Sequence, residues 1–329
     1  MDKLLTITPS PHIKQGDSVN KIMYSVIFAL IPALAWSFFI FGLPAVLITL
    51  TSVLSCVLVE WLIQKFIMKV EPTVKDGSAI LTGILLAMNV PAGLPLWIMI
   101  LGAVVAVGVG KMSFGGLGQN PFNPALVGRV FMLISFPVQM TTWPNITRQV
   151  VDATSEATPL ALVKEGVKGG ASVPEIMQTL PGYDELLLGN FSGSLGEISA
   201  ALLLIGMVYM LIRKVITWHI PLTIMATVFV FTGILYLVDP LQYADPVFHL
   251  LSGGLMLGAI YMATDMVTSP MSKRGQIIYA IGIGLITVSI RLWGAYPEGI
   301  SFAILIMNAF TPLINNYVKP KRFGEKKNG

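Results

Sequence analysis

The sequence has little charge: Asp, Glu, Lys and Arg make up only 12% of its 329 residues, whereas a soluble domain usually has about 25%. Hydrophobic residues make up 54%, and the mean hydropathy is +0.76. These values exclude an ordinary soluble protein and indicate an integral membrane protein. The net charge of +4 gives no indication of nucleic-acid binding, and the basic residues should instead mark the cytoplasmic side.

Side chains that hold redox centres are equally scarce. The one cysteine, Cys56, lies in an apolar run and is interpreted as a small buried thiol. A single cysteine cannot supply the four ligands that an iron–sulfur cluster normally takes. Of the three histidines, His219 and His249 fall at opposite faces of the predicted topology, which argues against a paired haem site. The sequence also has no Walker motif, no H-E-x-x-H and no Ser–His–Asp arrangement.

Long apolar segments are what the sequence has in abundance. A membrane-spanning helix needs about 20 mostly apolar residues. The candidates are 22–41, 44–65, 78–95, 96–112, 122–139, 197–213, 219–238, 249–265, 276–292 and 299–316. Several contain Gly or Pro, which favours broken or re-entrant segments that line a site. The sequence therefore predicts an all-α integral membrane protein with ten transmembrane helices.

Lys and Arg are distributed unequally between the two sides of this predicted topology. With both termini in the cytoplasm, only Arg148, Lys164, Lys168 and Arg291 of the 21 basic residues fall outside, as the positive-inside rule requires. The predicted parts are a cytoplasmic N-terminal arm (1–21), a first five-helix repeat (22–139), an extracytoplasmic loop (140–196), a second five-helix repeat (197–316) and a basic cytoplasmic tail (317–329).

Similar sequence features recur in the two halves. Residues 83–91 resemble residues 258–270, and each stretch is followed by a cation at a similar spacing, Lys111 in the first half and Arg291 in the second. Because each half has five predicted helices, an odd number, the second half must be inverted relative to the first. Two inverted repeats with broken helices are typical of transporters. The alternative is chance similarity between apolar segments.

Ionisable residues inside apolar segments are costly and are functional candidates. Glu60 could lie on an ion path, as a proton relay or a sodium ligand, or be a neutral, hydrogen-bonded carboxyl. Its obvious neighbour at helical spacing is Gln64. Arg129 could pair with an acidic lipid, a flavin or Glu60. Lys111 and Arg291 are expected to extend to the membrane interface.

Two polar interruptions could form a second site where the repeats meet. The segment 120–124 contains two prolines and cannot begin as a smooth helix, and its freed backbone groups need protein or cavity partners. A polar cluster also follows the eighth apolar segment. The candidate ligands of a flavin or an ion are Asn120, Asn123, Thr264, Asp265 and Thr268. The alternatives are a packed re-entrant turn at 120–124 and a cap of the eighth helix.

The extracytoplasmic loop contains a stretch of small and hydroxyl-bearing residues that begins at Asp152. As a local pattern it is typical of a helix start, with Asp152 or Ser155 as N-cap and Pro159 near the first helical position. It also offers uncrowded hydroxyl groups, because Ser155, Ala157 and Thr158 are small. Pro159 prevents a helix from continuing back through them.

The chain resembles the D subunit of the Rnf complex. The resemblance covers nearly the whole chain and includes residues 118–125, residues 262–270 and the loop pattern at 152–158, which is similar to Asp followed three residues later by Ser/Thr-Gly-Ala-Thr. The related B subunit of the sodium-pumping quinone reductase has a longer N-terminal extension and is one alternative. A channel or transporter with the same repeats and no flavin is the other.

The resemblance implies a covalent flavin in the loop. FMN would be esterified through its phosphate to Thr158 by a separate flavin transferase. The other residues of the attachment motif are Asp152, Ser155 and Ala157. Glu156 stands where the pattern usually has a small residue, and it adds bulk and a negative charge beside the phosphate. Thr154 is the alternative acceptor.

The resemblance also implies a function. The chain would be a flavin-carrying subunit of an ion-translocating ferredoxin:NAD⁺ oxidoreductase in the bacterial inner membrane, inactive alone. It would pass electrons through covalent FMN and couple this to Na⁺ or H⁺ transport. The implied partners are the A, B, C, E and G subunits of the Rnf complex, the flavin transferase and membrane lipid, with no nucleic acid. Riboflavin would be a second, non-covalent flavin.

Overall fold

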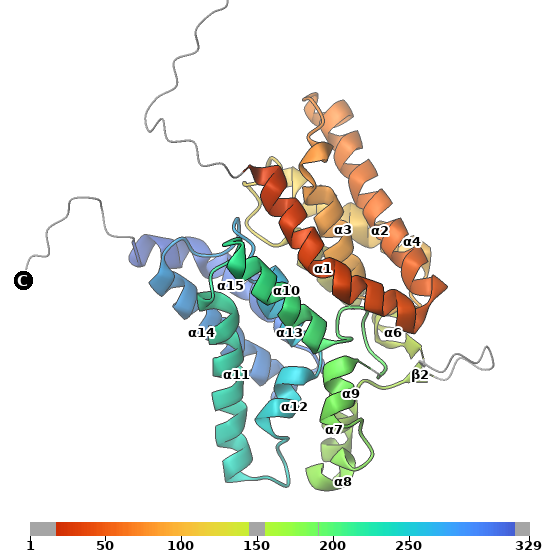
Figure 1. The fold of residues 1–329 in the computed structure, drawn as a ribbon, viewed down its shortest axis with the longest axis vertical. Helices are drawn as coiled ribbons and strands as arrows, with labels where there is room; N and C mark the ends of the chain where they lie inside the picture. Colours follow the sequence, from red (N-terminus) through yellow and green to blue (C-terminus); the bar gives the residue numbers. More distant parts are fainter. Residues whose placement is uncertain (1–17, 145–154, 190, 320–329) are drawn as a thin grey trace, which may run out of the picture.

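The computed structural model describes residues 18–144, 155–189 and 191–319. These residues are mainly helical (Figure 1). The strands within these ranges are β1 (Trp143–Pro144) and β2 (Ser155–Glu156), a short antiparallel pair in which Trp143 lies opposite Glu156. The predicted all-α class is therefore confirmed.

The first half of the chain forms a group of helices with short π-helical and 3₁₀ turns between them. Its elements are α1 (Val19–Phe41), α2 (Leu43–Leu62), η1 (Ile63–Met68), η2 (Val74–Asp76), α3 (Ser78–Met88), α4 (Leu96–Val104), η3 (Val105–Val109), η4 (Met112–Phe114), α5 (Pro124–Ser135) and α6 (Pro137–Thr141). Gly42 separates α1 from α2 with a φ of +65°, which glycine adopts at little cost.

The second half begins with three short helices and continues with longer apolar ones. Its elements are α7 (Pro159–Lys168), α8 (Val173–Met177), α9 (Tyr183–Leu188), α10 (Ala200–Ile212), α11 (His219–Val238), α12 (Pro246–Leu251), α13 (Leu255–Leu257), η5 (Gly258–Met262), α14 (Lys273–Trp293) and α15 (Ile300–Tyr317). The turn η5 is π-helical.

Six helical segments of the described chain are long and apolar enough to cross a membrane. They are Val19–Phe41, Leu43–Met68, Leu96–Phe114, His219–Val238, Lys273–Trp293 and Ile300–Tyr317. Three shorter apolar helices, α3, α5 and α10, fall within the third, fifth and sixth predicted segments. The 11 residues of α3 extend about 16 Å, which is roughly half of the hydrocarbon thickness of a bilayer.

The eighth predicted segment, 249–265, is not one continuous helix. That segment is divided among α12, α13 and η5. Ser252, after α12, has an extended backbone, and Gly253 follows with a φ of +69°. The third segment also ends early, at Met88, because Pro91 disfavours helical backbone in the residue before it.

The fifth predicted segment, 122–139, likewise contains two helices. Phe136 separates α5 from α6 with a φ of −133° and a ψ of 57°. This departure from helical geometry is expected for the residue before Pro137. At its other end α5 begins at Pro124, with Asn123 as its N-cap.

Close helix contacts depend on small residues in both halves. A methyl group at Gly83 of α3 would lie 2.6 Å from Cα of Val53 in α2, and one at Gly284 of α14 would lie 2.7 Å from Cβ of Thr227 in α11. Such contacts are typical of membrane helices. Large apolar side chains are exposed along α2, as a lipid-facing surface requires. They are Leu43, Leu47, Leu50, Leu54 and Leu58.

Helices α7, α8 and α9 gather at one end of the molecule (Figure 1). Trp36 of α1 donates its Nε1–H to the carbonyl of Leu188 at 2.8 Å, and Val173 N–H donates to the carbonyl of Leu241 at 2.8 Å. A separate apolar core joins these helices to α12. It contains Leu160, Val163, Val173, Leu186, Phe191, Ala244 and Phe248. This layer positions the start of α7, and with it Thr158.

Candidate functional site

Thr158 immediately precedes α7 and caps that helix. Its Oγ1 accepts a hydrogen bond from the backbone N–H of Ala161 at 3.3 Å, and Pro159 occupies the first turn. Thr158 is only 5% exposed. The helix start predicted from the local pattern is therefore confirmed, but its cap is Thr158 and not Ser155, while Asp152 lies outside the described residues.

The other residues of the attachment motif are placed only in part. Ser155 lies in β2, and Ala157 joins that strand to Thr158. Asp152 and Thr154 lie outside the described residues. The sequence predicts an uncrowded hydroxyl at Thr158. In the structure this side chain is instead buried, and it is hydrogen-bonded to the helix that follows it.

The first turns of α7 lie against the break between α12 and α13. Leu160 is buried, and its Cδ2 would lie 3.5 Å from a methyl group at Gly253. Lys164 donates its Nζ–H to the carbonyls of Ile290 at 3.1 Å and Tyr296 at 2.7 Å. Burial, followed by the charge of a nearby lysine, lowers the pKa of Lys164 to about 8.

The start of α7 has donors that suit a phosphate ester. The helix has ten residues, and the free N–H groups and dipole of a helix N-terminus favour a phosphate group. A cavity of about 230 Å³ lies beside the helix and is lined by Leu160, Lys164 and Trp293, among others. Small-molecule sites usually have at least about 300 Å³. A flavin ring would therefore require α7 or its neighbours to move.

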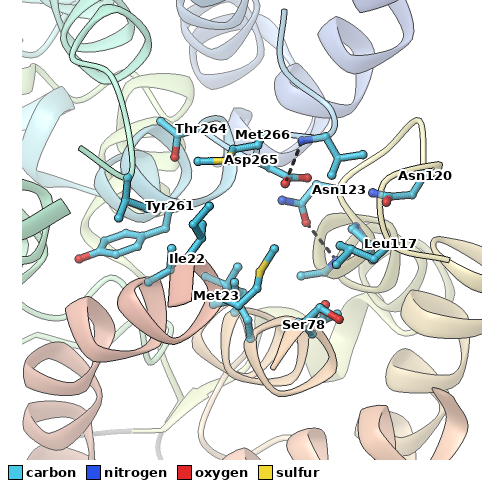
Figure 2. Close-up of a pocket in the computed structure, with 18 of the residues that line it drawn as sticks. Ile22, Met23, Ser78, Leu117, Asn120, Asn123, Tyr261, Thr264, Asp265 and Met266 are labelled. Carbon is cyan, nitrogen blue, oxygen red and sulfur yellow. Dashed lines mark hydrogen bonds between the residues drawn. The ribbon is translucent and has the colours of Figure 1, made fainter. Parts of the chain in front are cut away.

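A second polar site lies where the two halves meet, as Figure 2 shows. Asn123 Oδ1 accepts from the backbone N–H of Ala125 at 3.1 Å, and its Nδ2 donates to the carbonyl of Met262 at 3.2 Å. Asn123 thus joins the start of α5 to the end of η5. Asn120 is 3% exposed, and its Oδ1 has no hydrogen-bond partner in the described part of the chain.

The polar residues after η5 contribute the facing side of this site. Thr268 Oγ1 donates to Asp265 Oδ2 at 3.2 Å, and the backbone N–H of Val267 donates to Asp265 Oδ1 at 3.4 Å. Thr264 Oγ1 donates to the carbonyl of Ile260 at 2.6 Å. Four of the predicted ligands line one cavity: Asn120, Asn123, Thr264 and Asp265. Thr268 does not line it but holds Asp265.

The size of this cavity decides what it can hold. Its volume is about 90 Å³, which is room for several water molecules. A small ion with some of its water fits in that space. Lys111 lines the same cavity. The arrangement suits a small ion as it stands, and a flavin ring would require neighbouring side chains to move.

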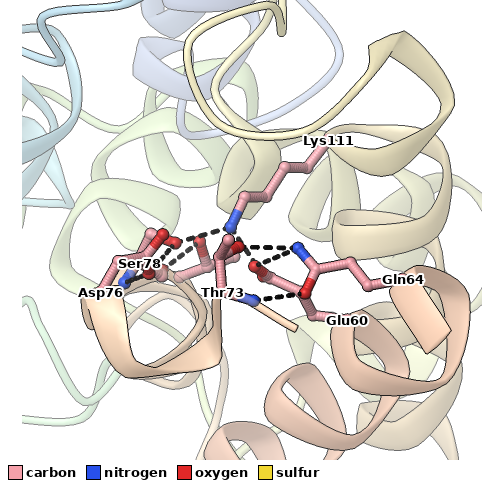
Figure 3. Close-up of polar contacts among 7 residues, drawn as sticks. Glu60, Gln64, Thr73, Asp76, Ser78 and Lys111 are labelled. Atoms are coloured by element: carbon pink, nitrogen blue, oxygen red, sulfur yellow. Dashed lines mark hydrogen bonds and ion pairs between the residues drawn. The ribbon is translucent and has the colours of Figure 1, made fainter. Parts of the chain in front are cut away.

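Glu60 and Lys111 form a buried ion pair (Figure 3). Lys111 Nζ lies 2.6 Å from Glu60 Oε2 and donates to Ser78 Oγ at 2.7 Å. Gln64 Nε2 donates to Glu60 Oε1 at 3.4 Å and to Thr73 Oγ1 at 2.8 Å. The expectation that Lys111 extends to the interface is wrong, because it is 1% exposed and Glu60 balances its charge.

Arg129 joins the two halves through a second buried ion pair. Its Nη2 pairs with the carboxylate of Glu298, and its Nη1 donates to the hydroxyl of Ser301. Its Nε donates to the carbonyl of Asn89 at 3.2 Å. Of the partners considered for Arg129, Glu60 is therefore wrong, since that carboxylate is bonded to Lys111.

Arg291 is also buried, and the expectation that it extends to the interface is wrong. It is 3% exposed and donates to the carbonyls of His249 at 2.5 Å and Ser252 at 2.9 Å. These carbonyls are free because the eighth segment is broken there. The sequence reading missed Glu197 and Glu298 as buried acids. Both glutamates could have been predicted as buried acids from the rule that an arginine buried in a membrane protein requires a partner.

Buried, paired charges between apolar helices are typical of membrane proteins that move ions. The chain belongs to the NQR2, RnfD, RnfE family, whose model matches residues 6–324. The match covers all the helices described above.

Several curated proteins are similar over nearly their full length. The D subunit of the Na⁺-translocating ferredoxin:NAD⁺ oxidoreductase complex of Acetobacterium woodii is 46% identical, with 98% of this chain and 96% of that protein covered. The D subunit of the proton-translocating complex of Clostridium ljungdahlii is 42% identical, with 98% and 97% covered. The D subunit of the ion-translocating oxidoreductase complex of Stutzerimonas stutzeri is 40% identical, with 95% and 94% covered.

Removing one partner of the Glu60–Lys111 pair should destabilise the protein. Lys111→Met leaves the Glu60 carboxylate buried without its counter-charge, so we expect a loss of about 3–5 kcal/mol in the free energy of unfolding. The double variant Glu60→Gln/Lys111→Met removes both charges and should regain most of that loss. Denaturant titration of the purified protein in detergent measures both values. Equal destabilisation of the single and the double variant would contradict the pairing.

Proposed function

We propose that this chain is the flavin-carrying membrane subunit of an ion-translocating ferredoxin:NAD⁺ oxidoreductase complex. The observation that carries the proposal is its similarity, over 98% of its length, to the D subunits of two such complexes. One of these relatives is named as proton-translocating and the other as Na⁺-translocating. Both ions are therefore candidates for this chain.

FMN esterified to Thr158 is the proposed electron carrier. When bound, the flavin supplies electron transfer, which the side chains of this sequence do not offer. The attachment motif consists of Asp152, Ser155, Ala157 and Thr158. Thr158 Oγ1 would bear the phosphate, and the N–H groups at the start of α7 would orient it. Because Thr158 is buried, the flavin transferase must act before α7 docks or while its start is displaced.

An inverted repeat is the proposed architecture of the two halves. It is supported by the way corresponding elements contact each other: α1 lies against α10, and α5 lies against α15. Within the halves, α2 contacts α4 as α11 contacts α14. The cations at matching positions, Lys111 and Arg291, are both buried, and each bonds to the start or the break of a short helix. The predicted repeats are 22–139 and 197–316.

Glu60 is the proposed residue on the ion path. It is bonded to Lys111, and Lys111 lines the cavity that also contains Asp265 and Asn120. The negative charge of Glu60 offsets the ammonium group beside that cavity. A cation or proton in the cavity would therefore experience a smaller repulsion while Glu60 is ionised.

The proposed location is the bacterial inner membrane, with both termini cytoplasmic and the loop at 140–196 extracytoplasmic. This is supported by the distribution of Lys and Arg and by the apolar helices. The chain carries no nucleotide-binding motif, so it would act only with partner subunits. The proposed partners are the A, B, C, E and G subunits of the Rnf complex and the flavin transferase.

Substitutions at Thr158 separate the flavin ester from the helix cap. Thr158→Asp keeps a side-chain oxygen that can cap α7 but has no hydroxyl to esterify, so we expect complete loss of covalent flavin and an intact fold. Thr158→Ala should lose the flavin and also about 1 kcal/mol of stability through the missing cap. The measurement is flavin fluorescence of the chain on a denaturing gel, after production together with the flavin transferase.

The control for this series is Thr154→Val, which removes the alternative acceptor and should leave the fluorescence unchanged. A native chain without fluorescence would overturn the proposal of covalent FMN. Fluorescence that survives in Thr158→Asp but is lost in Thr154→Val would move the ester to Thr154.

Glu60→Gln should uncouple ion transport from electron transfer. It leaves the charge of Lys111 unbalanced beside the cavity, so we expect a several-fold decrease in the ions moved per electron, with flavin content unchanged. The measurement is ion uptake into vesicles that contain the complex, relative to NAD⁺ reduction. The matched control is Glu71→Gln, which alters an exposed glutamate. An unchanged ratio in Glu60→Gln would remove this residue from the path.

A further inference from the structure

In the part of the chain that the structure describes, the cavity beside α7 is lined by basic side chains and by no acidic one. Its volume is about 230 Å³, and its walls come from α7, α12, α14 and the loop that follows α11. The cations are Lys164 and Lys168 of α7 and Arg291 of α14, and His249 of α12 lies beside them. Side chains of one charge that line a cavity attract ions of the opposite charge.

The buried side of this cavity has polar atoms without partners. Arg291 is 3% exposed, and its two Nη atoms donate to the carbonyls of His249 and Ser252. Its Nε has no hydrogen-bond partner among the described residues, and neither has Nδ1 of His249, which is also 3% exposed. Because a buried N–H group without a partner is costly, an acceptor oxygen beside Arg291 is favoured.

Glu298 lies near Arg291 but does not supply this acceptor. A methyl group at Gly253 would lie 2.7 Å from Glu298 Oε1 and 3.0 Å from Arg291 Nη2, so the carboxylate approaches the side of the guanidinium opposite Nε. Glu298 Oε1 accepts from the backbone N–H of Gly254 at 2.5 Å, and its other oxygen pairs with Arg129. The ion pairs of the described chain do not include one between Glu298 and Arg291.

Lys164 and Lys168 bring two further cations to the cavity from one face of α7. Lys164 donates to the carbonyls of Ile290 and Tyr296, which leaves one of its three N–H groups for another acceptor. Its pKa of about 8 keeps it mostly charged at about pH 7. Lys168 is exposed and forms no ion pair with a described residue. An anion between the two ammonium groups would reduce their repulsion.

The cavity opens where a spanning helix ends. Helix α14 has 21 residues, Lys273–Trp293, and extends about 31 Å, which matches a hydrocarbon thickness of about 30 Å. Its last residue, Trp293, lines the cavity and is 60% exposed, as is typical of tryptophan at a membrane interface. Lys168 and Gln242 are the other exposed lining residues. The cavity therefore lies at the depth of the lipid headgroups.

Apolar side chains form the remaining walls of the cavity. They are Leu160, Val163, Val167, Leu292 and Trp293, among others. A phospholipid has the matching combination of a phosphate for the cations and hydrocarbon for these walls. A zwitterionic lipid would also bring its own ammonium group against the lysines, so a headgroup with a net negative charge suits the cavity better.

We propose that this cavity binds the phosphate group of an anionic phospholipid. Arg291 Nε and the Lys164 ammonium group donate to the phosphate oxygens, Lys168 balances the charge at the opening, and the acyl chains leave the cavity past Trp293. The bound lipid joins α7 to α14 and so stabilises the docking of α7. The proposal is independent of the flavin ester, because Thr158 does not line this cavity.

Hydrogen exchange of the purified complex in nanodiscs tests the site. Discs of phosphatidylcholine alone are compared with discs that also contain phosphatidylglycerol. Because a bound ligand stabilises the state to which it binds, the backbone amides of α7 should exchange severalfold more slowly with phosphatidylglycerol. Phosphatidylcholine discs with added inorganic phosphate supply the free anion and should leave the exchange of α7 unchanged.

Lys168→Glu tests whether the slower exchange arises at this cavity. It changes the charge at the opening by two units, and each unit near an anionic lipid is worth about a fivefold change in affinity. Most of the slowing should therefore be lost, and the variant should fold because position 168 is exposed. The matched control is Lys273→Glu, at the other end of α14, which should keep the slowing.

The flavin-free variant Thr158→Asp should also keep the slowing, which separates this site from the proposed ester. Equal exchange of α7 in the two kinds of disc would overturn the proposal. So would equal slowing by inorganic phosphate, or slowing that survives Lys168→Glu. Loss of the slowing in Thr158→Asp would overturn it as well, by showing that the anion in the cavity belongs to the flavin.

Discussion

The fold depends on the requirement that every charge buried among apolar helices has a partner. A charge held in the water-free interior of a membrane protein costs several kcal/mol unless it is paired and hydrogen-bonded. Glu60 and Lys111 satisfy each other within the first half, and Arg129 and Glu298 do so between the halves. These pairs determine which helical segments are neighbours. Contacts between apolar side chains alone do not determine this, because such side chains pack equally well against lipid.

The broken helices follow from the same requirement. A helix that ends inside the protein leaves carbonyl and N–H groups free, and these need partners. The break after α12 offers the carbonyls of His249 and Ser252 to Arg291 and the N–H of Gly254 to Glu298. At the interruption before α5, the side chain of Asn123 donates to the carbonyl of Met262. The polar sites therefore lie where helices are interrupted, and the interruptions are stabilised by those sites.

Sequence reasoning predicted the helices with strong apolar patterns and missed the interactions between distant residues. The segment 219–238 agrees with α11 at both ends, because a continuous apolar run and the hydrocarbon thickness determine it. Broken segments were predicted, but the position of the break at Gly253 was not, since a single glycine is also common in unbroken membrane helices. The burial of Lys111 depends on Glu60, 51 residues away, and local spacing contains no information about such a pair.

Thr158 shows what could be predicted from the sequence and what could not. The local pattern correctly indicated a helix start, and Pro159 occupies its first turn. That the hydroxyl itself is the cap and is 5% exposed could not be read from the pattern, since it follows from the docking of α7 on α12. A residue that caps a helix while folded and carries a phosphate ester when modified must be reached before docking or through local opening.

The FMN ester on Thr158 is tested most directly by mass spectrometry of the proteolytic peptide that contains residues 149–164, taken from the native complex. This peptide should carry the added mass of FMN, and fragmentation should place the addition on Thr158. An unmodified peptide, from protein made together with the flavin transferase, would contradict the proposed ester.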